Sequence, residues 1–116
     1  MENEFPPRTY MVVGNWQCNG SVQSVKDYVN EVLNSAKFDT EKLEVVVAPI
    51  SIHIASAKAL LNSRIKVACQ NISHHQKGAY TGEISAEQLS DFDVKHVLIG
   101  SADRRTKFDE DDEAIS

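Results

Sequence analysis

Hydrophobic and polar positions change their period along the chain, and these changes predict alternating strands and helices. A short apolar run, Thr9–Val13, predicts a first strand. Ser21 then stands where it can cap the first N–H groups of a helix that reaches about Ala36. Apolar residues recur along this helix every three to four positions: Val22, Val25, Val29, Val32 and Leu33. This spacing is typical of an amphipathic helix with one buried face.

The next segment predicts a second strand at Leu43–Ala48. It contains three consecutive valines, which favour burial on both faces, as in a parallel sheet. Pro49 ends the strand, and Ser51 is placed to cap a second helix. The apolar face of that helix comprises Ile54, Ala57, Leu60 and Leu61. A third strand is predicted at Ile65–Gln70.

A long polar segment, Asn71–Gly82, separates the third strand from the last part of the chain. Ser85 and Gln88 have the spacing of a capping box, which predicts a short helix ending near Phe92. A fourth strand is expected at Lys95–Gly100.

The last segment is predicted to be polar and to end in a helix. Ser101–Lys107 reads as a polar turn. The acidic run Asp109–Glu113 then indicates a helix N-terminus, where carboxylates are stabilised. The whole pattern is βαβαβαβα, with crossovers long enough to join parallel strands.

Composition and charge narrow the class of protein. The chain has 116 residues, of which 41% are hydrophobic and 25% charged, as expected for one small globular domain. The formal net charge of −5 argues against nucleic acid and anionic membranes as partners. No apolar run is long enough for a membrane span or a secretory signal. Cys18 and Cys69 lack metal-type spacing and read as reduced thiols, so we expect a cytoplasmic protein.

The loop after the first strand is the first candidate site. In Gly14–Gly20 two glycines bracket a tryptophan, a cysteine and amide side chains. Glycine reaches backbone conformations that other residues avoid, so the bracket predicts a tight loop of defined shape. Loops at the carboxyl ends of parallel strands carry the active sites of α/β proteins.

Three further stretches complete a pattern with this loop: Gln70-Asn71, Gly78–Ser85 and Ile99–Arg105. In their order, their spacing and their positions after predicted strands they resemble the N-terminal half of triosephosphate isomerases, from about Arg8 to Ser116. The resemblance implies an α/β fold, namely about four β/α units of a TIM (β/α)8 barrel of roughly 250 residues. Residues 1–8 would be a flexible lead-in and residues 9–116 the partial barrel.

The resemblance also implies an activity, the glycolytic interconversion of dihydroxyacetone phosphate and glyceraldehyde 3-phosphate without a cofactor. Two departures put that activity in question. The family's first loop reads Asn-x-Lys, and here Asn15 is followed by Gln17. The family's Gly-His-Ser-Glu-Arg-Arg is here Gly100-Ser101-Ala102-Asp103-Arg104-Arg105, so Ser101 replaces the histidine and Asp103 the glutamate. Losing one preorganised electrostatic group costs about 10²–10³ in rate.

Other residues resemble the family's subunit interface. Cys18 resembles a position that contacts the neighbouring subunit, and Thr81, Gly82 and Glu83 resemble the loop tip that reaches into it. Arg104 resembles the partner of Glu83. The alternatives are a small buried thiol for Cys18 and ordinary turn chemistry for the loop tip.

Several candidate residues have a simpler interpretation, which we favour. Asn15 and Gln17 can bind a polar ligand, but they can equally satisfy backbone groups of their own loop. His74 and His75 are adjacent, which is poor spacing for one metal ion, so we expect no metal site. Arg104 and Arg105 are followed by acidic residues, which favours an internal salt-bridge network over an anion site.

A half barrel also has consequences for assembly. Its first and fourth strands would be edges with unpaired N–H and C=O groups, and such edges pair with another chain or aggregate. We therefore expect a homo-oligomer, a partner chain that completes the barrel, or a rearranged open sheet.

Three functions remain open at this point. The first is an isomerase homologue without catalysis that acts as a structural or interaction subunit, for which triose phosphate binding is doubtful. The second is part of an active isomerase completed by a missing half. The third is a small anion-binding α/β module, which ranks last because no GxGxxG or P-loop pattern is present.

Overall fold

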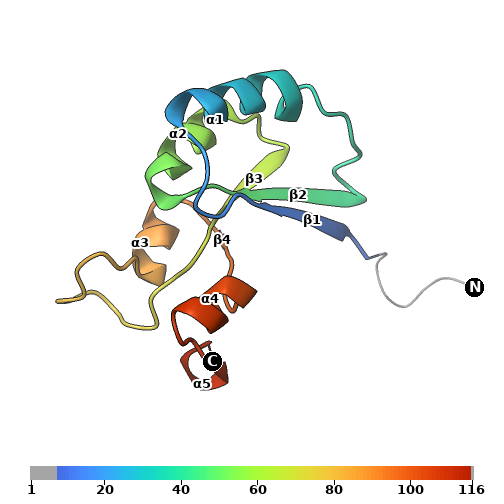
Figure 1. Ribbon diagram of the computed structural model, residues 1–116. Coiled ribbons are helices and arrows are strands. Elements are labelled where there is room, and N and C mark those ends of the chain that lie inside the picture. The colour runs from blue at the N-terminus through green and yellow to red at the C-terminus, as the bar shows by residue number, and fades with distance from the viewer. Residues whose placement is uncertain (1–7, 116) are drawn as a thin grey trace, which may run out of the picture.

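The computed structural model describes residues 8–115, and the expected lead-in lies mostly outside this range. It contains four parallel strands in the order β1-β2-β3-β4, with helices between them (Figure 1). The strands are β1 (Tyr10–Asn15), β2 (Leu43–Ala48), β3 (Ile65–Cys69) and β4 (His96–Val97). The α-helices are α1 (Val22–Tyr28), α2 (Ile54–Leu60), α3 (Ala86–Asp91), α4 (Ala102–Lys107) and α5 (Asp112–Ile115). Two short turns of other helix types are η1 (Val29–Leu33) and η2 (Ser51–His53). This curled parallel sheet is the expected N-terminal half of a TIM barrel.

Helices α1, α2 and α3 cover one face of the sheet, which is the outer face of the half barrel. Val25, Val29 and Leu33 pack there against Val47 and other apolar residues. A second cluster joins Ile54 of α2 to apolar residues of β3 and α3. Both clusters follow from the alternation of side chains along each strand, which sends every second residue to this face.

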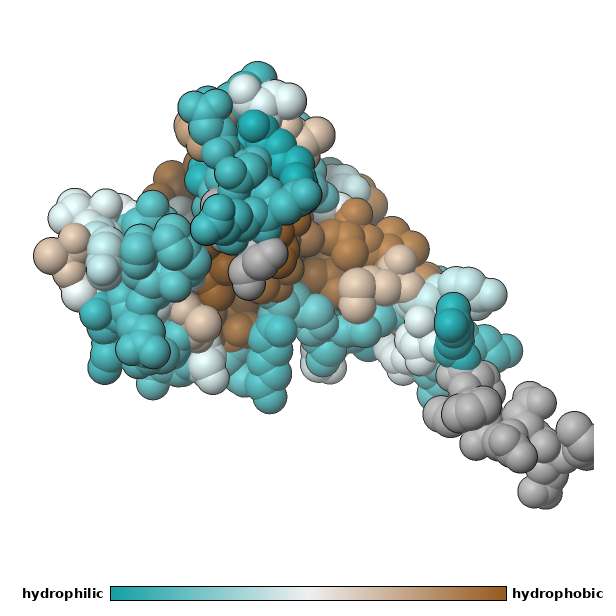
Figure 2. Space-filling model, turned by 90° about the horizontal axis from the view of Figure 1, so that it is seen from below, coloured by the Kyte–Doolittle hydropathy of each residue, from teal (hydrophilic) through white to brown (hydrophobic). Residues whose placement is uncertain are grey.

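The inner face of the sheet is apolar and has no helix layer. Val46, Ala48 and Ala68 are buried there and pack with Leu98. Figure 2, seen from the side opposite α1 and α2, shows an uncovered hydrophobic surface in the middle of this face. Met11 and Val13 belong to the same face, since Val13 pairs with Val46, and both are exposed. The half barrel thus exposes apolar side chains of the inner face that a closed barrel would bury.

Strand pairing becomes shorter along the sheet. Strand β1 pairs with β2 at six positions, β2 with β3 at three, and β3 with β4 at only two. The expected strand at Lys95–Gly100 is therefore too long, because β4 has a neighbour on one side only and the chain turns at Gly100 with φ +68°. One further hydrogen bond, from Leu98 N to the Cys69 carbonyl at 2.8 Å, continues the ladder.

Two predicted helix starts are confirmed in detail. Ser21 caps α1 through a reciprocal pair of hydrogen bonds with Ser24, at 3.0 and 2.8 Å. Ser85 and Gln88 form the expected capping box at α3. The first helix is shorter than expected in its α-helical part, because it continues from Val29 as a π-helical turn that ends at Leu33.

Two predicted features are wrong, and a third is displaced along the chain. Ser51 does not cap α2, because it lies inside the 3₁₀ turn η2 that precedes this helix. The expected polar turn at Ser101–Lys107 is largely the helix α4. The predicted acidic helix is present, but it begins only at Asp112, after residues 108–111, which are not helical and in which Asp109 has φ +54°. Along the described residues, no helix combines the length and apolar character that crossing a membrane requires.

The packing predicts that two valines of the first helical segment contribute very differently to the free energy of unfolding. Val29 is fully buried in the outer-face cluster, whereas the side chain of Val32 is 47% exposed. Val29→Ala should lower the free energy of unfolding by about 2–3 kcal/mol, because it removes buried methyl groups and leaves a cavity. Val32→Ala should change it by less than about 0.5 kcal/mol. Urea denaturation of the two variants measures the difference, and equal effects would contradict the packing described here.

Candidate active site

The loop after β1 has a defined shape that local hydrogen bonds maintain. Asn15 ends the strand, and its side-chain Oδ1 accepts the N–H of Gln17 at 2.9 Å. Gln17 has φ +53°, in the left-handed region that non-glycine residues rarely adopt. Asn19 closes the loop by donating from its side chain to the carbonyl of Trp16 at 3.2 Å. Asn15 therefore contributes to loop structure, as its simpler interpretation predicts.

Gln70 connects three strand ends, although sequence reasoning did not single it out as a site residue. Its side-chain amide donates to the carbonyl of Gln17 at 2.7 Å and to that of Ala48 at 2.9 Å. The signal in the sequence is a polar residue directly after the buried end of β3. Gln70 holds the β1 loop against β2 and so supports the left-handed conformation of Gln17.

Ser101 and Asp103 lie at the start of α4 and interact with each other. The Ser101 hydroxyl donates to the Asp103 carboxylate, and this hydrogen bond is the main reason why the pKa of Asp103 is lowered. Ser101 is half-buried and occupies the N-cap position of the helix. A side chain at this position can donate one hydrogen bond, but it carries no charge.

Arg104 and Arg105 are both engaged with the acidic residues that follow them, as predicted. Arg104 Nη2 bonds Glu110 Oε2 at 2.8 Å, and Arg105 Nη1 bonds Asp112 Oδ1 at 2.8 Å. The Arg104 contact lowers the pKa of Glu110, and the same contact raises the pKa of Arg104. Arg104 Nε is buried and makes no hydrogen bond to the residues described. These cations are therefore committed to carboxylates of their own chain.

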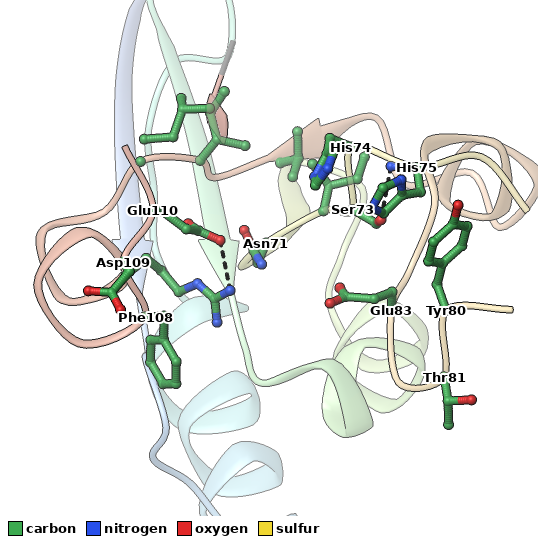
Figure 3. A pocket seen from close by; sticks show the side chains of 16 residues that line it. Asn71, Ser73, His74, His75, Tyr80, Thr81, Glu83, Phe108, Asp109 and Glu110 are labelled. Atoms are coloured by element: carbon green, nitrogen blue, oxygen red, sulfur yellow. Dashed lines mark hydrogen bonds and ion pairs between the residues drawn. The ribbon is translucent and has the colours of Figure 1, made fainter. Parts of the chain in front are cut away.

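A cleft of about 700 Å³ lies between the long loop after β3 and the helices after β4 (Figure 3). Thr81, Glu83 and Arg104 line it, and the negative charge of Glu83 contributes to the raised pKa of Arg104. The rings of His75 and Tyr80 stack in parallel with their centroids 4.0 Å apart on its loop side. The expected contact of Glu83 and Arg104 between subunits stays a prediction, while within one chain the two border the same cleft.

The structure does not bring all predicted site residues into one place. Asn15, Gln17, Ser101 and Asp103 do not line this cleft, and Cys18 is exposed on the β1 loop. Gly82 lines a smaller cleft of about 260 Å³ that also includes Gln70, Glu83 and Arg104. Within the described part of the chain, no cluster of three or more His, Cys, Asp or Glu residues is arranged to hold a metal ion.

Comparison with known proteins finds similarity to the triosephosphate isomerases. The model of the triosephosphate isomerase family matches residues 10–116. A chloroplastic triosephosphate isomerase of Secale cereale is 44% identical over 106 residues, which are 91% of this chain and 35% of the relative. The triosephosphate isomerase of Paracoccidioides lutzii is 39% identical over 110 residues, or 95% of this chain and 43% of the relative. The triosephosphate isomerase of Francisella philomiragia is 38% identical over 105 residues, which are 90% of this chain and 41% of the relative. The chain thus spans roughly two-fifths of the length of these relatives.

The Arg104–Glu110 pair predicts a stability loss in acid. Because Glu110 has a lower pKa when folded than its ordinary value of 4.5, it stabilises the fold above that value. This contribution is lost as the pH falls through the lowered folded pKa. Glu110→Gln should therefore destabilise the protein by about 1–2 kcal/mol at pH 7 and by less near pH 3.

Denaturation between pH 7 and pH 3 measures this dependence. Glu87→Gln is the matched control, because Glu87 forms an exposed pair with Lys77 at 3.8 Å and exposed pairs contribute at most about 1 kcal/mol. A Glu110→Gln effect that stays constant over the whole range would contradict the assignment.

Proposed function

Because the chain belongs to the triosephosphate isomerase family, we propose that it is a partial-barrel relative of these enzymes that lacks catalysis and serves as a cytoplasmic structural or interaction subunit. The main support for the proposal is the chemistry of two side chains. Gln17 and Ser101, at positions that resemble the family's catalytic lysine and histidine, are both uncharged.

The β1 loop supports this proposal, because it keeps a specific shape without a cation. The left-handed backbone of Gln17 is maintained by the bonds from Asn15 and Gln70. A lysine in such a loop would present a fixed positive charge to a phosphorylated substrate. A neutral amide retains hydrogen bonding but loses the electrostatic attraction to a dianion, which makes triose phosphate binding weak.

The end of β4 supports the same conclusion. The Ser101 hydroxyl is engaged with Asp103, and a hydroxyl is a poor substitute for an imidazole in polarising a carbonyl group or transferring protons. The nearby Arg104 and Arg105 guanidinium groups are paired with Glu110 and Asp112. Loss of an electrostatic donor and of proton transfer each lowers a rate by at least about 10²-fold.

An alternative is that the chain forms one part of an active isomerase. The retained left-handed conformation of Gln17 favours it, because backbone strain of this kind is concentrated at functional sites. The remaining units would then have to provide the general base. This alternative and the inactive subunit predict different outcomes in the assay described below.

The edge of β1 indicates how the chain would act as a subunit. Tyr10 and Val12 are 75% and 55% exposed, and no charged residue, proline or bulge interrupts the strand. Natural edges are usually protected by such features against pairing with another strand. We therefore propose that β1 accepts a parallel strand, from a partner chain that completes the barrel or from a second copy.

An isomerase assay tests the absence of catalysis. The chain is combined with the remaining four β/α units of a relative, and turnover is measured with and without the double substitution Gln17→Lys and Ser101→His. We expect no turnover above background for the natural sequence and a rise of at least about 100-fold for the double variant. A matched control, Gln23→Lys with Ser56→His, places the same residue types on exposed helix positions and should leave turnover at background.

One outcome would contradict the inactive subunit, and another would contradict its explanation by Gln17 and Ser101. Turnover of the natural sequence at about a thousandth of a normal isomerase rate would favour the active alternative. No rise in the double variant, in an assembly shown to be folded, would mean that more than these two groups separates the site from an isomerase.

Sedimentation tests the proposed role of the β1 edge. The isolated chain should sediment as a species larger than its monomer mass of 12.9 kDa. Val12→Lys should shift the distribution toward the monomer, because a charge on an edge strand opposes pairing. Gln23→Lys adds the same charge on α1 and should not. A monodisperse 12.9 kDa species with cooperative unfolding would refute the edge proposal.

A further inference from the structure

A side-chain hydrogen bond crosses the inner face of the sheet and joins two strands that are not neighbours. His96 Nε2 of β4 lies 2.9 Å from Glu44 Oε1 of β2, and β3 runs between these strands. Both side chains are about one-third exposed. Since the Glu44 carboxylate accepts, the Nε2 position of His96 carries the donated hydrogen.

The strand register shows why this contact depends on the curl of the sheet. Ala68 is paired with His96, while Val46, two residues beyond Glu44, is paired with Lys66. Glu44 and His96 therefore lie two strand spacings apart, with β3 between them, and are also offset by several residues along the strands. In a flat sheet this diagonal would be long for a direct contact, because neighbouring strands are about 4.8 Å apart and residues rise about 3.3 Å each.

The contact between His96 and Glu44 is most important for the position of β4, because this strand makes few other contacts with the sheet. Two register pairs and the Leu98 bond to Cys69 are its connection to β3 along the described residues. Leu98 packs on the inner-face cluster. Gly100 and Ser101 follow Leu98 after one intervening residue, so the position of β4 determines where the end-of-strand side chains are placed.

We propose that Glu44 and His96 form a strut that sets the curl of the sheet at β4 and thereby positions Ser101, Asp103 and Arg104 at its carboxyl end. His96 is a positioning residue in this proposal and takes no part in chemistry. The strut holds whether the assembled barrel is active or not, so the proposal does not rest on the absence of catalysis.

Other charged groups nearby do not replace the strut. Lys66 shares the inner face by alternation, but its Nζ donates to the carbonyl of Ser63 at 3.3 Å. Lys95 pairs with Asp93 at 3.7 Å, and both side chains are more than two-thirds exposed. β1 contributes no titratable side chain to this face, where Met11 and Val13 stand.

Hydrogen exchange of backbone amides in the full chain tests the strut. His96→Phe keeps a ring but removes the donor, and it should accelerate exchange of the Leu98 amide about tenfold. His96→Gln places an amide nitrogen near the position of Nε2 and should stay within about twofold of the natural chain. The buried Val46 amide in β2 is the internal reference and should be unchanged in both variants.

Two more variants complete the test. Glu44→Gln keeps an acceptor without the charge and should give an intermediate rate at Leu98, while Lys95→Gln, beside His96, should have no effect. The strut is refuted if His96→Phe and His96→Gln behave alike, or if Leu98 exchange does not change. Equal acceleration at Val46 and Leu98 would also refute it, because the pair would then act on the whole fold. None of these rates depends on catalysis or on a partner, so the outcome is separate from that of the proposed function.

Discussion

A parallel sheet is stable when both faces and both edges of its strands are covered, and this half barrel has a helix layer on one face only. The outer face is filled by α1, α2 and α3, which bury one side of β2 and β3. The inner face and the β1 edge expose apolar residues that a closed barrel would bury. Closure is the constraint from which the expected association and the uncovered surface both follow.

The sheet also becomes weaker from β1 to β4, although both of these strands are edges. Strand β1 is an edge but pairs with β2 along its whole length, whereas β4 is paired at two positions. Side chains therefore do part of what backbone hydrogen bonds do elsewhere in the sheet. Leu98 packs on the inner cluster and His96 reaches Glu44, so the placement of β4 depends on a few identifiable contacts.

The sequence predicted the fold correctly where the local hydrophobic pattern agrees with burial. It failed where contacts with distant segments determine the length or the start of an element. Leu43–Ala48 was predicted to the residue because its valines are buried on both sides. The fourth strand was predicted too long, because its length depends on a neighbour that sequence alone does not reveal. Ser51 looked like a cap, but the position of a 3₁₀ turn is set by the exit from β2. Gln70 was missed as a site residue because its two acceptors are backbone carbonyls of distant segments.

In the β1 loop, backbone hydrogen bonds determine the shape, whereas the side chain at position 17 determines the chemistry. A glutamine in the left-handed region costs roughly 1–2 kcal/mol relative to an ordinary conformation, and nothing in a neutral side chain requires that conformation. The bonds from Asn15 and Gln70 offset this cost, and both are made to backbone atoms of Gln17, whatever its side chain is. The backbone of the loop would therefore keep its shape with either a charged or a neutral side chain at this position. The shape of this strand end and the chemistry of the side chain at position 17 are thus independent of each other.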